Sequence, residues 1–166
     1  MQSKFLTVFA VFDDRTQQKL TEWQNQILAL GNLGTQTMNI PFHITLGSFP
    51  TSEEDVLVNK IEQECLKNCK FFINLKRVNH FNNAVLFIEP EANVQLKALH
   101  EKFDCNYANG FDWHPHATMF CGQAEHVERA KALLNEKFAP FTAQITGIQM
   151  GEFFPTKMII AKYLQD

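Results

Sequence analysis

Two segments of this chain repeat each other in sequence and in their surroundings. One is Pro41–Phe49, the other is Trp113–Phe120, and both contain His-x-Thr followed by an apolar residue. Their histidines, His43 and His116, are 73 positions apart. A match in both motif and context constrains the fold strongly, because it indicates that one structural unit occurs twice.

Hydrophobic periodicity predicts the elements of this unit. In the first half we expect a strand over 4–12, a helix over 15–30 capped by Asp14, a strand over 42–48, a helix over 52–69 and a strand over 71–80. In the second half we expect a strand over 84–88, a helix opened by Pro90, a strand over 115–121, a helix over 124–138 and strands over 141–152 and 157–164. Each histidine lies 13 residues after the preceding helical pattern, measured from Leu30 or Phe103.

This repeated order of strand, helix, strand, helix and strand predicts an α+β fold. We expect a single domain over residues 1–166 with two lobes, about 1–81 and 82–166, between which strands are free to exchange. Two antiparallel sheets would surround a central cleft, with the helices outside. No linker rich in Gly, Ser or Pro separates the halves, which predicts tight packing of the lobes.

The overall charge limits the partners that such a chain can bind. A formal net charge of −3 argues against a protein that coats nucleic acid, because such proteins need a basic face. We expect no stable DNA binding, whereas a nucleotide or an RNA terminus remains compatible. The apolar run Phe5–Phe12 continues into Asp13 without a small-residue cleavage site, so it predicts a strand rather than a signal peptide. No segment is long enough to span a membrane, and we expect a cytoplasmic monomer.

The two motifs predict a site between the lobes. Residues two apart in a strand face the same side, so His43 shares a face with Thr45, and His116 shares one with Thr118 and Phe120. The intervening apolar residues would pack under the helices, which turns the His/Thr faces toward the space between the lobes. Two histidines can supply a general base and a general acid, and threonine hydroxyls can donate to phosphate oxygens.

The segments His43–Leu46 and His116–Met119 resemble the two signature motifs of the 2H phosphoesterase superfamily. This superfamily includes the 2′-5′ RNA ligase-like proteins and the cyclic phosphodiesterases, and the order of elements resembles it over essentially the whole chain. The resemblance implies a bilobal, LigT-like fold and metal-independent chemistry on 2′,3′-cyclic or 2′-5′ phosphodiesters. It also implies that His43 and His116 are catalytic and that Thr45 and Thr118 bind the phosphate.

Further residues are candidates for the cleft without a matching motif. Aromatic side chains there could stack on a base or simply pack, namely Phe120, Phe49, Trp113 and Phe153. His114 lies two positions before His116 and could support it or belong to a loop. A metal site would need a third or fourth ligand, and none stands at a suitable spacing, so we expect neither a metal nor a cofactor.

The sequence therefore predicts a phosphodiesterase acting on the cyclic phosphate of a nucleotide or an RNA terminus. Two alternatives remain open: RNA 2′-5′ ligation by reversal of diester cleavage, and a non-catalytic nucleotide-binding module. The intact acid–base pair favours an enzyme over the module. Which histidine acts as the base and which as the acid is not determined by the sequence.

Overall fold

The structure is a computed structural model that describes residues 3–31 and 33–166. Within these residues the elements follow one another in the order β1 (Phe5–Phe12), α1 (Asp14–Leu28), β2 (His43–Pro50), a 3-10 turn (Thr51–Glu53), α2 (Glu54–Lys67), β3 (Phe71–Phe81), β4 (Val85–Pro90), α3 (Val94–Lys102), β5 (Ala117–Cys121), α4 (Ala124–Lys137), β6 (Phe141–Phe153) and β7 (Lys157–Tyr163). The predicted unit thus occurs twice, as β1-α1-β2-α2-β3 and β4-α3-β5-α4-β6, and β7 follows it.

Two predicted helix starts are wrong by a few residues. Asp13, rather than Asp14, caps α1, because its carboxylate accepts a hydrogen bond from the Thr16 backbone N–H. Pro90 does not open α3 but ends β4, at an end of the strand where its missing N–H is tolerated. The cap of α3 is Asn93, whose side chain accepts from Leu96 N at 2.9 Å.

All strand pairs are antiparallel, and they form one continuous sheet in the order β2-β1-β6-β3-β4-β5, with β7 also paired to β6. The α+β class is confirmed, but the two expected sheets are joined through β6. The first part of this long strand pairs with β3, over Phe141–Ile145, and the remainder pairs with β1. β3 is the third strand of the first half, but it pairs with β4 of the second half. β6 is the third strand of the second half, but it pairs with β1 of the first half. The two halves therefore exchange their third strands.

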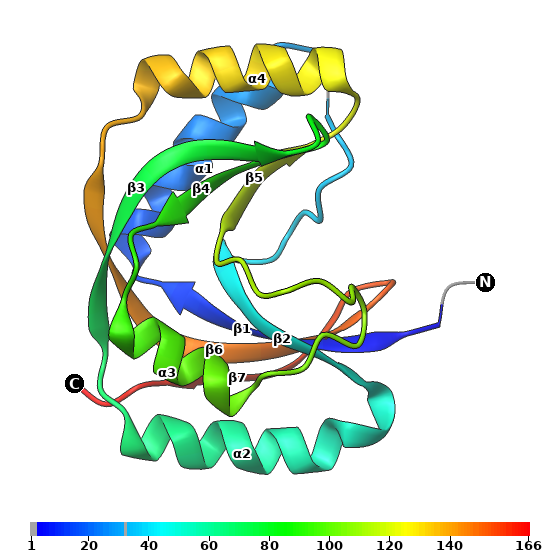
Figure 1. Ribbon diagram of the computed structural model, residues 1–166, viewed down its shortest axis with the longest axis vertical. Coiled ribbons are helices and arrows are strands. Elements are labelled where there is room, and N and C mark those ends of the chain that lie inside the picture. The colour runs from blue at the N-terminus through cyan, green and yellow to red at the C-terminus, as the bar shows by residue number, and fades with distance from the viewer. Residues whose placement is uncertain (1–2, 32) are drawn as a thin grey trace.

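The helices lie outside the curved sheet in two groups (Figure 1). Helices α1 and α4 contact each other and cover β5, while α2 lies against β6 and β7, and α3 against β2. Helices are therefore exchanged as well, since α1 covers a strand of the second half and α3 covers a strand of the first. The main core fills the space between the sheet and these helices and includes Leu20, Ile61, Leu99 and Leu134. Burial of this apolar surface is the main force that holds the two halves together.

The strands β2 and β5, at the two ends of the strand order, are each covered by a loop from the opposite half. Ser48 N in β2 donates to Cys105 O at 2.8 Å, and Thr35 N donates to Cys121 O in β5 at the same distance. The sheet also curves so strongly that β2 and β5, which end the strand order, contact each other (Figure 1). This curvature brings together the starts of the two strands that carry the His-x-Thr motifs.

Candidate active site

The two motif histidines have the same local geometry. His43 is the first residue of β2, and His116 directly precedes β5. The Nδ1 atom of His43 lies 2.8 Å from Pro41 O, and that of His116 lies 2.6 Å from His114 O. A carbonyl oxygen can only accept, so each Nδ1 carries the hydrogen. In the neutral ring Nε2 is then the unprotonated nitrogen, which is the atom that general acid–base chemistry requires.

Each imidazole also packs on a phenylalanine from the neighbouring strand. The Phe9 ring lies 4.3 Å from that of His43 between centroids, and the Phe87 ring lies 5.0 Å from that of His116. Phe9 pairs with Thr45 across β1 and β2, and Phe87 pairs with Thr118 across β4 and β5. The two half-sites are therefore equivalent in side-chain packing as well as in backbone geometry.

A β-bulge follows each His-x-Thr motif. The pairing of β1 with β2 skips Leu46, and the pairing of β4 with β5 skips Met119. The carbonyl oxygens of these two residues accept hydrogen bonds from helix side chains, His100 Nδ1 at 2.7 Å and Gln24 Nε2 at 2.9 Å. Both bulges are thus supported by a helix that packs from the other half of the sequence.

The second bulge overturns the prediction for Phe120. A bulge interrupts the alternation of side chains, so Phe120 does not share the face of His116 and Thr118. Its side chain is only 1% exposed and belongs to the main core. Phe120 therefore presents no surface on which a base could stack.

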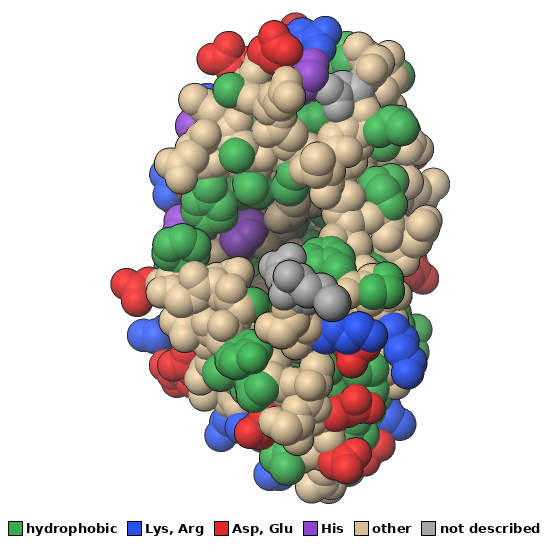
Figure 2. Space-filling view, turned by 90° about the vertical axis from the view of Figure 1, so that its right-hand side faces the viewer, with side chains coloured by type: hydrophobic (Ala, Val, Ile, Leu, Met, Phe, Trp, Pro, Cys, Tyr) green, Lys and Arg blue, Asp and Glu red, His purple; other side chains and the backbone are tan. Residues whose placement is uncertain are grey.

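The surface is hollowed about midway along the length of the molecule, and histidine side chains lie beside this hollow (Figure 2). Burial lowers the pKa of His43 to about 4, against the raising effect of its bond to Pro41 O, and a positive charge on His116 lowers it further. Burial also lowers the pKa of His116. Because each charge disfavours the other, the two histidines are electrostatically coupled and do not readily hold two protons together.

The remaining predicted cleft residues have different environments. Trp113 is held in place, since its Nε1 donates to Thr45 O at 2.8 Å and its ring stacks on His100 with centroids 3.9 Å apart. Phe153 is 5% exposed in a small apolar cluster with Phe9 on the concave face, whereas Phe49 packs against the main core. Thr45 and Thr118 are both half-buried. The structure thus brings Trp113 next to the first motif through Thr45, and Phe153 next to it through Phe9, whereas Phe49 packs against the core.

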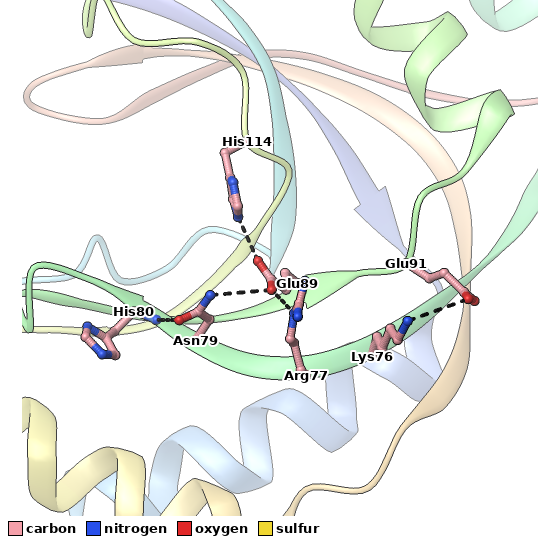
Figure 3. Close-up of polar contacts among 7 residues, drawn as sticks. All are labelled: Lys76, Arg77, Asn79, His80, Glu89, Glu91 and His114. Carbon is pink, nitrogen blue, oxygen red and sulfur yellow. Dashed lines mark hydrogen bonds and ion pairs between the residues drawn. The ribbon is translucent and has the colours of Figure 1, made fainter.

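The last of the weaker candidates, His114, has a partner that the sequence reasoning missed. Its Nε2 lies 2.7 Å from Glu89 Oε2 (Figure 3). Burial alone would raise the pKa of Glu89, but hydrogen bonds from His114 and Arg77 hold it below its ordinary value. The signal available in the sequence was a carboxylate inside the otherwise apolar strand Val85–Pro90, because a buried charge requires a partner.

The described ranges, 3–31 and 33–166, contain no group of three or more His, Cys, Asp or Glu side chains placed to hold a metal ion. Within the same ranges, none of the helices combines the length and the apolar character needed to cross a membrane.

The fold matches crystal structures of known proteins at low sequence identity. Escherichia coli LigT in its apo form has a TM-score of 0.64 and 12% identity, over 99% of this chain and 100% of that chain. TT0787 of Thermus thermophilus has a TM-score of 0.63 and 13% identity, over 97% and 98%. A structure described as a phosphoesterase has a TM-score of 0.60 and 13% identity, over 99% and 100%. These likenesses establish a LigT-like fold.

The sequence itself places the chain in a family. The family model of the 2′-5′ RNA ligase superfamily matches residues 12–153, which is most of the chain. The chain therefore belongs to this superfamily, and the resemblance to the 2H phosphoesterases is confirmed. No curated protein matches the chain by sequence.

Proposed function

We propose that this chain is a metal-independent phosphodiesterase that acts on 2′,3′-cyclic phosphate or 2′-5′ phosphodiester bonds of RNA ends or nucleotides. The observation that carries the proposal is the equivalence of the two half-sites. Each holds a histidine by its Nδ1 against the carbonyl two residues earlier, packs its ring on a phenylalanine, and places a threonine two residues later.

This arrangement supplies what hydrolysis of a cyclic phosphodiester requires. One neutral histidine takes a proton from water as the water oxygen bonds to phosphorus. The other, protonated at Nε2, gives its proton to the ribose oxygen as the bond from that oxygen to phosphorus breaks. The hydroxyls of Thr45 and Thr118 donate to the non-bridging oxygens and stabilise the charge that builds up there. Both proton transfers and the phosphate contacts come from side chains, so the mechanism requires no metal ion.

Known ligands of a similar fold support a nucleotide substrate. Crystal structures of E. coli LigT show that protein complexed with 3′-AMP, with ATP, with phosphate and with NADP+. For this chain we propose a substrate of the same chemical kind, with a phosphodiester seated between the two threonines.

Substitution of the catalytic pair tests the proposal. We expect His43→Ala and His116→Ala each to reduce kcat/KM for 2′,3′-cyclic nucleotides by at least about 10²-fold, the usual contribution of one acid–base group, while far-UV circular dichroism stays unchanged. His126→Ala, at the first turn of α4, is the matched control and should retain activity.

The same assay separates the alternatives. Binding of cyclic nucleotides without turnover would favour a non-catalytic module, and formation of a 2′-5′ linkage from a cyclic-phosphate end and a 5′-hydroxyl end would show the reverse reaction. Strong inhibition by EDTA would contradict the metal-independent mechanism.

A further inference from the structure

Glu89 is a buried carboxylate beside one of the two half-sites. Its side chain is only 5% exposed, although β4 is otherwise apolar in its interior. A carboxylate this deeply buried must be compensated by charge and hydrogen bonds. Its Oε1 atom accepts from Arg77 Nε and, at 3.4 Å, from Asn79 Nδ2, while its Oε2 atom contacts His114 Nε2 (Figure 3).

His114 connects this carboxylate to His116. The ring of His114 is held by Glu89, and its backbone carbonyl accepts the hydrogen of His116 Nδ1. Phe81 packs edge-to-face on both rings, with centroids 5.3 Å from His114 and 5.0 Å from His116. Glu89 therefore holds the His114 side chain, and the His114 backbone in turn holds the ring of His116.

Among the residues that the structure describes, the first half-site has no counterpart of this arrangement. Val11 of β1 pairs directly with His43 of β2. In the second half Ile88 pairs with Ala117, so the next residue, Glu89, occupies the position beside His116 that Val11 occupies beside His43. The position two residues before His43 is Pro41, which offers its carbonyl but no titratable side chain. The ring of His43 instead contacts Phe9, which clusters with Val11 and other apolar residues. An apolar side chain beside His43 therefore corresponds to a charged one beside His116.

We infer that Glu89 is a positioning residue that keeps the proton on His116, so that His116 serves as the general acid and His43 as the general base. The inference rests on the proposed function and assigns its acid role and its base role to particular histidines. A nearby carboxylate stabilises an imidazolium, whereas apolar surroundings favour the neutral ring. In each turnover the proton leaves His116 Nε2 for the ribose oxygen, and His43 Nε2 accepts one from water. Exchange with solvent then restores the starting state.

The pKa of His116 lies below its ordinary value because of burial, and the charge of Glu89 acts against that lowering. The charge of His114 also lowers this pKa, while the bond to the His114 carbonyl raises it. Arg77 lies behind Glu89 and partly offsets the carboxylate, and His43 faces it from β2. At His43 the raising effect comes from the Pro41 carbonyl, and the pKa stays at about 4.

Two substitutions with opposite expected signs test the role of Glu89. Glu89→Gln removes the carboxylate charge with little change of shape, so NMR titration of the histidine ring protons should show the pKa of His116 lowered further. Arg77→Gln removes the offsetting cation, whose side chain is 68% exposed, so the same titration should show that pKa raised. Glu91→Gln is the matched control, because Glu91 is exposed and paired with Lys76 away from His114 (Figure 3).

The pH dependence of hydrolysis then tests the assignment of roles. In Glu89→Gln the alkaline limb of the kcat/KM profile should move to lower pH by the same amount, because the acid loses its proton earlier, and the acid limb should stay in place. Movement of the acid limb instead would show that His116 is the base and would overturn the assignment.

The two measurements fail in distinguishable ways. Hydrolysis together with an unshifted His116 titration would overturn the role of Glu89 alone. A shifted titration in a protein that hydrolyses neither cyclic phosphates nor 2′-5′ phosphodiesters at any pH would overturn the proposed function, and the acid–base roles with it. If Glu89→Gln does not fold, Arg77→Gln decides: an unchanged His116 titration in that variant would refute the inference.

Discussion

Gly47 lies at a close approach between the two halves that permits no side chain. A methyl group added at this position would lie 1.9 Å from the backbone carbonyl oxygen of Phe103 and 3.1 Å from that of Cys105. Contacts shorter than 3.0 Å do not occur for real Cβ atoms, so the backbone must move by about 1 Å. Phe103 belongs to the segment that covers β2 and leads to His116, and no flexible side chain is available to yield instead.

We therefore expect Gly47→Ala to lower the free energy of unfolding by about 3 kcal/mol or more, the upper end of the cost of overpacking. For a chain of this length, such a loss corresponds to a fall in Tm of about 6–12 °C. Urea unfolding followed by circular dichroism measures the first quantity, and calorimetry the second. We also expect a lower kcat/KM in the folded variant, because the displaced segment carries Trp113 and the second histidine.

Gly110→Ala is the matched control. The same methyl group there meets no atom within 4 Å, so the cost is limited to the left-handed backbone at φ +69°, about 1–2 kcal/mol. If Gly47→Ala is no more destabilising than Gly110→Ala, the close approach of the two halves at β2 is refuted.

Two further predictions concern pH and the entry of the chain into β2. The folded pKa of His43, about 4, lies below the ordinary value of 6.5, so the unfolded chain binds a proton that the folded chain does not. The free energy of unfolding should thus fall by about 2–3 kcal/mol between pH 7 and pH 4.5. This loss should be absent in His43→Gln, and equal losses in urea titrations of both proteins would contradict it. Gln17 exchanges two hydrogen bonds, of 2.7 and 2.8 Å, with the Phe42 backbone. Gln17→Leu should therefore cost about 1–3 kcal/mol, whereas Leu at the exposed Gln18 should cost little in the same thermal unfolding assay.

Local sequence patterns predicted most of the elements because they depend on neighbouring residues. Apolar residues at helical spacing predicted α1, α2 and α4, and β-branched and aromatic runs predicted the strands. The errors lie at the ends of elements, as at Asp14 and Pro90, where the bonds of a single side chain decide. The pairing of His43 with His116 was also accessible, because the motif recurs at the same place in a repeated unit.

The amino-acid sequence alone specifies the repeated order of elements and the four residues of the two His-x-Thr motifs, since periodicity and repetition are properties of the chain. The tertiary structure decided which strands pair, and therefore that β3 and β6 exchange between the halves. It also decided that a bulge at Met119 turns Phe120 into the core, and that Glu89 contacts His114 although 25 residues separate them. These features arise from register and packing between distant segments, which no local pattern encodes. The sequence defines two equivalent histidines, and the folded environment makes them different.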